Sequence, residues 1–308
     1  MTTPAAERTT AVEEHWTRVD GTETRYLAAG DGHPVLLIHG EGSVAEQWYD
    51  ILRGLAGSYR VIAVDLPGYG YTKPIPDGSV PALASFVGRF VRALGLERPV
   101  LIGHSLGGAV AVHAALARPN RVPALVLVSS AGMGRAISPA YIIQAVTPLG
   151  DLTRFLVPVL PFGPQLLVAS TALTGSCRPW RISAPWWSSQ AHAASTPVAL
   201  ETALRSQRSS VGLLGQKKPI LGRLPELPMP TLVAWGLRDR QVPFWQGIAA
   251  RRRLRRGRLA LVPCSSHLLP LEAPEDLLKA VRPFLADLDL AHDPSDQDHG
   301  PTDRGDLS

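Results

Sequence analysis

Three side chains of this sequence have the types and the order that nucleophilic attack on a carbonyl group requires. Ser105 stands between two glycines in the stretch Gly103-His104-Ser105-Leu106-Gly107, directly after a short apolar run. Asp239 and His267 each follow a later apolar run. A serine hydroxyl is a weak nucleophile that needs a basic imidazole, and the imidazole needs a carboxylate to orient it. The order therefore predicts Ser105 as nucleophile, His267 as base and Asp239 as orienting acid.

The glycines around Ser105 also admit two other interpretations, a plain strand-to-helix turn and a loop that cradles a cofactor phosphate. The dinucleotide fingerprint requires glycine where Ser105 stands, and the P-loop requires a Gly-Lys-Ser/Thr that is absent. Small residues two positions before and after a serine permit the tight, strained turn that presents a nucleophile. The later aspartate and histidine favour this third interpretation over the plain turn, and we expect no cofactor.

The elements that must position these residues are those of an α/β fold. Runs rich in Val, Leu and Ile alternate with helical patterns, which predicts a mostly parallel sheet with helices on both faces. A leading antiparallel hairpin is expected over residues 15–32, with Asp20-Gly21 at its turn. The expected strands that follow are residues 34–40, 60–68, 99–105, 124–130, 231–236 and 258–264. The expected helices are residues 46–56, 81–94, 106–118, 245–256 and 274–288.

The alternation of strands and helices breaks between residues 135 and 226. This segment is rich in Pro, Ser and Ala, shows no clear strand, and contains Trp180, Trp186 and Trp187. We expect a helical cap over the carboxyl edge of the sheet, where open α/β sheets place their sites. The tryptophans either line the pocket or pack the cap. The core of the fold is then residues 15–134 and 227–290.

One part of this cap, residues 155–177, contains no charged residue. Pro158, Pro161 and Pro164 interrupt it, whereas a membrane-spanning helix requires about 20 mainly apolar residues without such breaks. We expect a buried or pocket-lining segment and no stable membrane insertion, with contact to a membrane surface as the alternative.

The composition, 45% hydrophobic and 19% charged over 308 residues, is typical of a soluble globular protein. Only Cys177 and Cys264 are present, so neither a disulfide framework nor a cysteine metal site is expected, and Cys264 is expected to be buried. Residues 1–14 lack the apolar core of a signal peptide, and we interpret them as the flexible N-terminus of a cytoplasmic protein.

The net charge of +5 is unevenly distributed along the chain. Six arginines lie in residues 251–258, and no aromatic residues interleave them. We therefore interpret this run as the solvated face of a surface helix rather than a nucleic-acid site. The tail, residues 291–308, carries five aspartates against one arginine and is predicted to be disordered.

Five segments, taken together and in this order, resemble the α/β-hydrolase superfamily in its capped serine-hydrolase branch. They are LLIHGEG (36–42), VDLPGYGYT (64–72), GHSLGGA (103–109), WGLRD (235–239) and SHLLPLEAPE (266–275). The resemblance covers roughly residues 15–290 and implies an α/β-hydrolase fold with a helical cap inserted after strand six. It also implies a Ser105-Asp239-His267 triad, an oxyanion hole formed by the backbone N–H groups of Glu41 and Leu106, and no metal.

Glu41 departs from the small or apolar residue that this family often has at its position. We expect its side chain to point to solvent, as carboxylates mostly do. The alternative is a carboxylate close to the site, which would disfavour anionic substrates. His39 is expected to shape the oxyanion loop through hydrogen bonds, and His104 to point away from the site. Asp65 precedes the serine, against the family order, so we expect it to fix its own loop rather than to act as the triad acid.

The resemblance implies hydrolysis of a carboxylic ester through an acyl-enzyme, on a small to medium apolar molecule. Serine at position 105 disfavours dehalogenase and epoxide hydrolase chemistry, which the family performs with aspartate. The alternatives are a carbon–carbon bond hydrolase of ring-fission products, a cofactor-free perhydrolase and, in a different class, a triad-bearing ligand receptor with little turnover. SSAGMGR (129–135) resembles the carbon–carbon group, whereas HGEGSVAEQW (39–48) and Leu268 differ from it. Ester hydrolysis is therefore ranked first.

Overall fold

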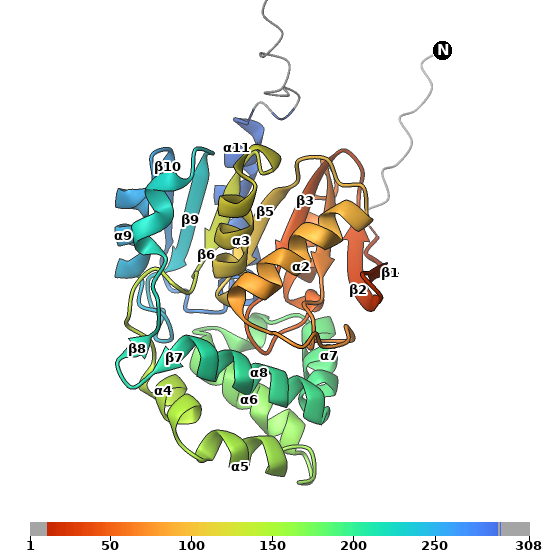
Figure 1. The fold of residues 1–308 in the computed structure, drawn as a ribbon, viewed down its shortest axis with the longest axis vertical. Coiled ribbons are helices and arrows are strands. Elements are labelled where there is room, and N and C mark those ends of the chain that lie inside the picture. The colour runs from red at the N-terminus through yellow and green to blue at the C-terminus, as the bar shows by residue number, and fades with distance from the viewer. Residues whose placement is uncertain (1–10, 289, 291–308) are drawn as a thin grey trace, which may run out of the picture.

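A twisted eight-stranded sheet forms the centre of the fold in the computed structural model, which describes residues 11–288 and 290 (Figure 1). The strand order is β1-β2-β4-β3-β5-β6-β9-β10. The hairpin of β1 (Glu13–Val19) and β2 (Thr22–Ala29) joins β4 antiparallel, and all other neighbouring strands pair in parallel. These strands are β3 (His33–Ile38), β4 (Tyr59–Val64), β5 (Val100–His104), β6 (Leu125–Val128), β9 (Thr231–Gly236) and β10 (Gly257–Val262). The predicted mostly parallel sheet is confirmed.

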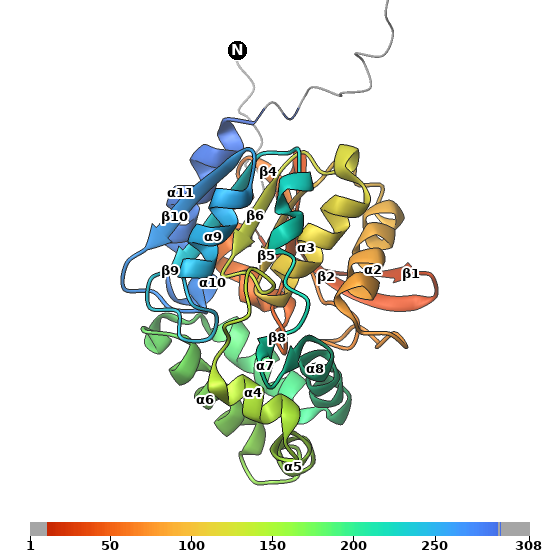
Figure 2. The same ribbon diagram turned by 60° about the vertical axis from the view of Figure 1, so that its left-hand side comes forward.

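Helices cover both faces of the sheet (Figure 2). One face carries α2 (Val80–Ala93), α3 (Leu106–Ala117) and α9 (Trp245–Arg253). The other carries α1 (Tyr49–Leu55), the short α10 (Leu269–Glu272) and α11 (Pro274–Ala286). Phe90 and Phe284 are buried on opposite faces, each in its own apolar cluster with the strands. The arginines at the end of α9 are exposed, as interpreted from the sequence. A strand layer buried on both faces explains why the strand residues are almost all apolar.

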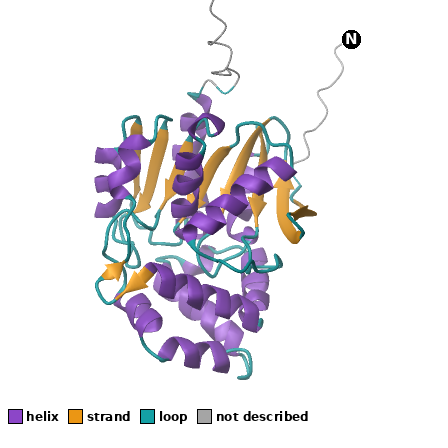
Figure 3. Cartoon of the chain, in the orientation of Figure 1, coloured by secondary structure: helices purple, strands orange, loops and turns teal. Residues whose placement is uncertain are grey.

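The chain between β6 and β9, residues 135–226, is called the insertion below. Its helices lie beyond the carboxyl ends of the parallel strands (Figure 3). They are α4 (Pro139–Val146), α5 (Leu149–Leu156), α6 (Gly163–Gly175), α7 (Ala184–Ser195) and α8 (Pro197–Ser210). The two-residue strands β7 (Val211–Gly212) and β8 (Gly215–Gln216) were not expected. Short 3-10 turns complete the chain: η1 (Ala45–Trp48), η2 (Pro119–Arg121), η3 (Pro179–Arg181) and η4 (Leu221–Glu226).

The insertion contacts the core through an apolar cluster of its own. Val168 on α6 and Trp186 on α7 are buried together with Val44 and Leu268 from the core. Pro139 and Pro197 stand at the first position of α4 and α8, where the missing N–H is tolerated and the fixed backbone angle favours helix formation. These prolines are the local signal for helices in a segment that otherwise has little periodicity.

The structure corrects the expectation for residues 155–177, which are not buried as a whole. Phe155 is 62% exposed and Phe162 is 75% exposed. The reason is that α5 and α6 pack against the rest of the insertion on one side only, so their remaining apolar side chains face outward. Cys264 lies in the turn after β10 and is exposed, so the expectation that it is buried is wrong.

The tryptophans of the insertion line neither of the two cavities described below. Trp186 and Trp187 pack in the apolar cluster of the insertion, whereas Trp180 is exposed and does neither. At the N-terminus, β1 begins at Glu13, inside the segment expected to be flexible. Residues 1–10 and the acidic tail, residues 291–308, lie outside the described residues. No helix in the described part of the chain is long and apolar enough to cross a membrane.

Candidate active site

Ser105 occupies the sharp turn between β5 and α3. Its backbone has a φ of 50° and a ψ of −116°, which lies in the left-handed region that residues other than glycine avoid. The neighbouring chain is so close that a Cβ at Gly103 would overlap the carbonyl oxygen of Gly107, and a Cβ at Gly107 would overlap that of Ile38. These two glycines therefore allow the turn, which aims the free N–H groups at the start of α3 toward the serine.

The three residues predicted from the sequence form one hydrogen-bonded chain. His267 Nδ1 donates to Asp239 Oδ2 at 2.9 Å, and His267 Nε2 lies 3.1 Å from Ser105 Oγ. A carboxylate only accepts, so Nδ1 carries the proton and Nε2 is left to accept the serine hydroxyl. The other carboxylate oxygen of Asp239 accepts the backbone N–H groups of Gln241 and Val242, both at 2.9 Å. Asp239 is thereby fixed in the orientation that the imidazole needs.

The loop after β3 lies directly against the serine. A Cβ added at Gly40 would be 3.3 Å from the Cβ of Ser105, and Glu41 is the next residue. Gln47 Oε1 accepts the N–H of Gly40 at 3.2 Å and holds this loop in place. On the other side of the serine, Leu106 is the first residue of α3, where a helix leaves its N–H groups without partners inside the helix. The two predicted oxyanion residues thus flank Ser105.

His39 joins the oxyanion loop to the loop after β4. Its Nε2 accepts the N–H of Leu66 at 2.9 Å, so Nδ1 carries the proton that it donates to Gly40 O at 2.7 Å. Burial lowers the pKa of His39 to about 4, which keeps the ring neutral at pH 7. The expected role in shaping the loop agrees with these contacts.

Asp65 holds its own loop, as the sequence suggested. Its carboxylate accepts the N–H groups of Ala45 at 2.7 Å and Tyr71 at 3.1 Å. Arg25 donates to Asp65 at 3.2 Å and to Glu46 at 2.6 Å, and all three side chains are buried. Burial raises the pKa of Asp65 to about 6, while the guanidinium lowers it. Nothing in the sequence marked Arg25 and Glu46, because their pairing depends on strands that meet only in the fold.

His104 is buried and does not line the cavity beside Ser105, so its predicted direction, away from the site, agrees with the structure. Its Nε2 lies 2.9 Å from the backbone oxygen of His267, to which it donates, and the two rings are 4.8 Å apart. Burial holds the pKa of His104 well below its usual value, and the nearby His267 lowers it further. A neutral His104 thus supports the loop that carries the base.

Glu41 does not point to solvent, which corrects the expectation from the sequence. Its side chain faces the insertion, where Ser206 Oγ donates to Glu41 Oε2 at 3.3 Å. Burial raises the pKa of Glu41 to about 8, although hydrogen bonds from Ser206 and Gln207 lower it. The physical reason for the difference is that the insertion covers this loop. At pH 7 the carboxyl group is therefore mostly protonated and can donate a hydrogen bond.

Glu272 is a buried carboxylate that the sequence reasoning missed. It accepts hydrogen bonds from the Ser176 hydroxyl at 2.8 Å and the Cys177 N–H at 2.7 Å, both in the insertion. Its other oxygen accepts the Ser265 hydroxyl at 3.1 Å, in the loop that leads to His267. The partners in the insertion lie about 95 residues away in the chain, so no local pattern could have found them. Glu272 links the insertion to the histidine loop.

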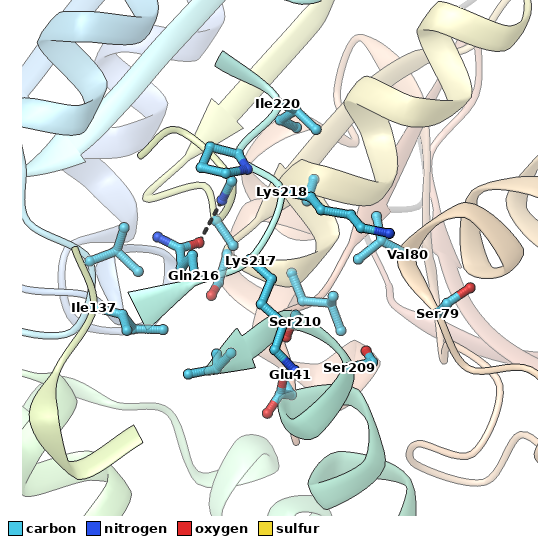
Figure 4. A pocket seen from close by; sticks show the side chains of 18 of the residues that line it. Glu41, Ser79, Val80, Ile137, Ser209, Ser210, Gln216, Lys217, Lys218 and Ile220 are labelled. Carbon is cyan, nitrogen blue, oxygen red and sulfur yellow. Dashed lines mark hydrogen bonds between the residues drawn. The ribbon is translucent and has the colours of Figure 1, made fainter. Parts of the chain in front are cut away.

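Two cavities lie between the core and the insertion. The first has a volume of about 510 Å³ and is lined by Ser105 and His267 together with side chains from both parts of the chain. Figure 4 shows Glu41, Lys217 and Lys218 in its lining. The second has a volume of about 620 Å³ and shares Glu41 with the first. Within the described residues, no group of three or more His, Cys, Asp or Glu side chains could hold a metal ion.

Comparisons with known proteins identify the family of this chain. The model of the alpha/beta hydrolase fold family matches residues 33–274. The 2-hydroxy-6-oxo-6-(2'-aminophenyl)hexa-2,4-dienoic acid hydrolase of Metapseudomonas resinovorans is 30% identical over 286 residues, which cover 90% of this chain and 92% of that protein. A crystal structure of a membrane phospholipase A, described as a bacterial virulence factor, superposes with a TM-score of 0.72 at 28% identity and covers 90% of this chain and 86% of that one.

A further relative matches only in part. The dihydrolipoyllysine-residue acetyltransferase component of the acetoin cleaving system of Cupriavidus necator is 40% identical over 171 residues, which are 55% of this chain and 44% of that protein. This chain therefore spans less than half the length of that relative. The family match covers the strands from β3 to β10, the serine turn and the loops that carry the aspartate and histidine. The chain belongs to the α/β-hydrolase fold family.

Proposed function

We propose that this protein is a serine hydrolase that cleaves a carboxylic ester of a small to medium apolar molecule through an acyl-enzyme. The observation that carries the proposal is the hydrogen-bonded chain from Asp239 through His267 to Ser105, which opens onto the first cavity. The insertion serves as a cap over this cavity. No organic cofactor takes part in the proposed reaction.

In the acylation step, Ser105 Oγ attacks the ester carbonyl carbon while its proton passes to His267 Nε2. Asp239 stabilises the resulting imidazolium, and the N–H groups of Glu41 and Leu106 donate to the oxyanion. The tetrahedral intermediate then expels the alkoxide, which takes the proton from His267. The products of this step are an alcohol and an ester of Ser105.

In the deacylation step, water enters the place that the alcohol has left. His267 takes one proton from the water as its oxygen attacks the acyl carbon, and the same two N–H groups stabilise the second oxyanion. Collapse of this intermediate breaks the bond to Ser105 Oγ, which recovers its proton from His267. A carboxylic acid is released and the enzyme is regenerated.

An apolar substrate is supported by the lining of the first cavity. Its wall includes a group of aliphatic side chains, among them Val80, Ala109, Ile220 and Val242, beside polar and charged ones. Apolar walls with a few directed polar groups are typical of small-molecule sites. The structural relative named as a phospholipase A also bears the name of an ester hydrolase.

Hydrolysis of a carbon–carbon bond is the second candidate function. The relative from Metapseudomonas resinovorans, which covers nearly the whole chain, is named as the hydrolase of a dienoic acid. Lys217 and Lys218 line the first cavity and would suit the carboxylate of such a substrate. The same serine, histidine and oxyanion donors would then act on a ketone carbonyl.

A side-by-side assay tests both candidates. We expect short-chain esters to be hydrolysed faster than a ring-fission dienoate, and Ser105→Ala to lower kcat roughly 10⁴- to 10⁶-fold. A fluorophosphonate should add its mass to the wild-type protein and not to Ser105→Ala, with circular dichroism as the control for folding. Faster cleavage of the dienoate would reverse the ranking. A folded wild-type protein that is neither labelled nor active would instead be a ligand receptor.

A further inference from the structure

The outer side of the insertion presents apolar side chains that no other part of the described chain covers. They lie on α5, on the turn of residues 157–162 and on the first turn of α6. Val159 is 74% exposed and Leu166 is 65% exposed. The apolar outer face is defined by Leu152, Phe155, Val159, Leu160, Phe162 and Leu166. Contiguous exposed apolar surface of this kind marks an interaction site on a protein.

The shape of this face is that of a projecting end. Figures 1 and 2 show α5 and the turn after it at the end of the molecule that is farthest from the sheet. The side chains surround a helix–turn–helix tip, and this tip contains no charged residue from Phe155 to Leu166. A projecting apolar tip can insert into a lipid bilayer, whereas a folded protein partner would need a groove of matching shape.

The charge of the insertion favours a bilayer with anionic rather than neutral headgroups. Residues 135–226 contain nine lysines and arginines against three acidic residues, whereas the rest of the chain contains 22 against 23. All three acidic residues of the insertion pair with arginines: Asp151 with Arg208, Glu201 with Arg205 and Glu226 with Arg223. The insertion therefore presents a net positive charge, which is complementary to anionic lipid headgroups.

Four cations without an ion pair in the described chain contribute to the net charge of the insertion, and they lie on its side toward the core rather than at its tip. Among the residues that the structure describes, Arg178, Arg181, Lys217 and Lys218 form no ion pair. Trp180 stands between the two arginines and is exposed. Exposed tryptophan beside arginine is typical of side chains at a membrane–water interface.

The second cavity reaches from the outer helices to the candidate active site. Leu149 on α5 and Leu173 on α6, both exposed, line its outer part. Glu41 lines its inner part and also lines the first cavity, which contains Ser105. Tyr141 and Gln241 also line both cavities, so the two cavities adjoin, and an apolar chain in the second lies next to the cavity that contains Ser105.

We propose that the apolar outer face docks this protein on an anionic phospholipid bilayer, from which an acyl chain reaches Ser105 through the second cavity. The docking stands on the exposed face and the charge of the insertion alone. The delivery of an acyl chain rests on the proposed ester hydrolysis. The substrate class that follows is a long-chain ester presented at a membrane surface.

Co-sedimentation of the full-length protein with vesicles tests the docking. We expect binding to vesicles of phosphatidylcholine and phosphatidylglycerol, weaker binding to phosphatidylcholine alone, and loss of binding as salt is raised. The double variant Phe155→Ser/Phe162→Ser should lower the partition coefficient at least about tenfold, because two exposed phenyl rings no longer leave water. Trp16→Ser is the matched control, since Trp16 is an exposed aromatic residue on β1, outside the insertion.

The proposal is overturned if the wild-type protein does not bind the anionic vesicles, or if the double variant binds them as well as the wild type. It is also overturned if light scattering shows a wild-type dimer that the double variant dissociates, since the face would then join two copies of this chain. Ser105→Ala should bind vesicles normally, and the double variant should still hydrolyse a soluble short-chain ester. If the protein binds vesicles but hydrolyses no ester, the proposed ester hydrolysis is wrong and the proposed docking stands.

Discussion

Strand β3 and the tip of the insertion are both charge-free, apolar stretches, yet they differ completely in exposure. Val35, Leu37 and Ile38 are fully buried, because helices cover the sheet on both faces. Phe155 and Phe162 are more than half exposed, because α5 and α6 are covered on one side only. The number of layers around an element, more than its composition, decides whether its apolar residues are buried.

Apolar side chains also have different roles in these two regions. In the core, burial stabilises the fold and holds the loops that carry Ser105, Asp239 and His267 at one edge of the sheet. In the outer insertion, the same residue types remain in water and contribute little to folding. Substitutions in the two regions should therefore have different consequences, and three of them break or sharpen the contrast.

The largest expected effect is on stability. Phe90→Ala should lower the free energy of unfolding by about 3–5 kcal/mol, because Phe90 is fully buried and its removal leaves a cavity. Phe155→Ala should change it by less than about 1 kcal/mol, since the ring is mostly in water and its cation–π contact with Arg154 is at the surface. Urea denaturation followed by circular dichroism measures both. Equal losses in the two variants would show that the tip of the insertion is part of the folding core.

The second effect is expected where the two regions meet. Glu272→Gln should lower the free energy of unfolding by about 2–3 kcal/mol, because an NH2 group replaces one of the two accepting oxygens and then faces buried donors. It should also lower kcat, through displacement of His267, with a smaller change in KM. Glu275→Gln is the matched control, since Glu275 is exposed at the start of α11. A variant with normal stability and normal kcat would remove the proposed link.

The third effect is a pH dependence, and it concerns Glu41, on the loop that the insertion covers. Burial raises its pKa from 4.5 to about 8, so between these two pH values the folded protein holds a proton that the unfolded chain has released. Stability should therefore fall as pH rises through this window, and this loss should be absent from Glu41→Gln. We expect the melting temperature of Glu41→Gln to rise relative to wild type between pH 5 and pH 8. A constant difference across this range would place the carboxyl group in solvent.

The features that could be predicted are those that depend on residues close together in the sequence. The parallel sheet follows from alternating runs, and Ser105, Asp239 and His267 each follow a strand whose end lies at the same edge. Glu272 and Arg25 could not be predicted, because their partners come from distant parts of the chain. The direction of Glu41 depends on the helices that cover it, and the exposure of Phe155 depends on a layer that is missing. A stretch without charged residues predicts that its side chains are shielded from water. It does not tell whether the same chain or another surface shields them.

The link through Glu272 has a mechanical consequence for the insertion. The insertion is joined to the core at its two chain ends, and Glu272 adds an attachment at residues 176–178. The N–H of Leu268 donates to Gly175 O at 2.9 Å beside it. Ser206 on Glu41 and Gln190 on Gly42 attach α8 and α7 to the loop after β3. A body held at several separate places does not swing on a single hinge, and the end of α6 is fixed to the loop that carries His267.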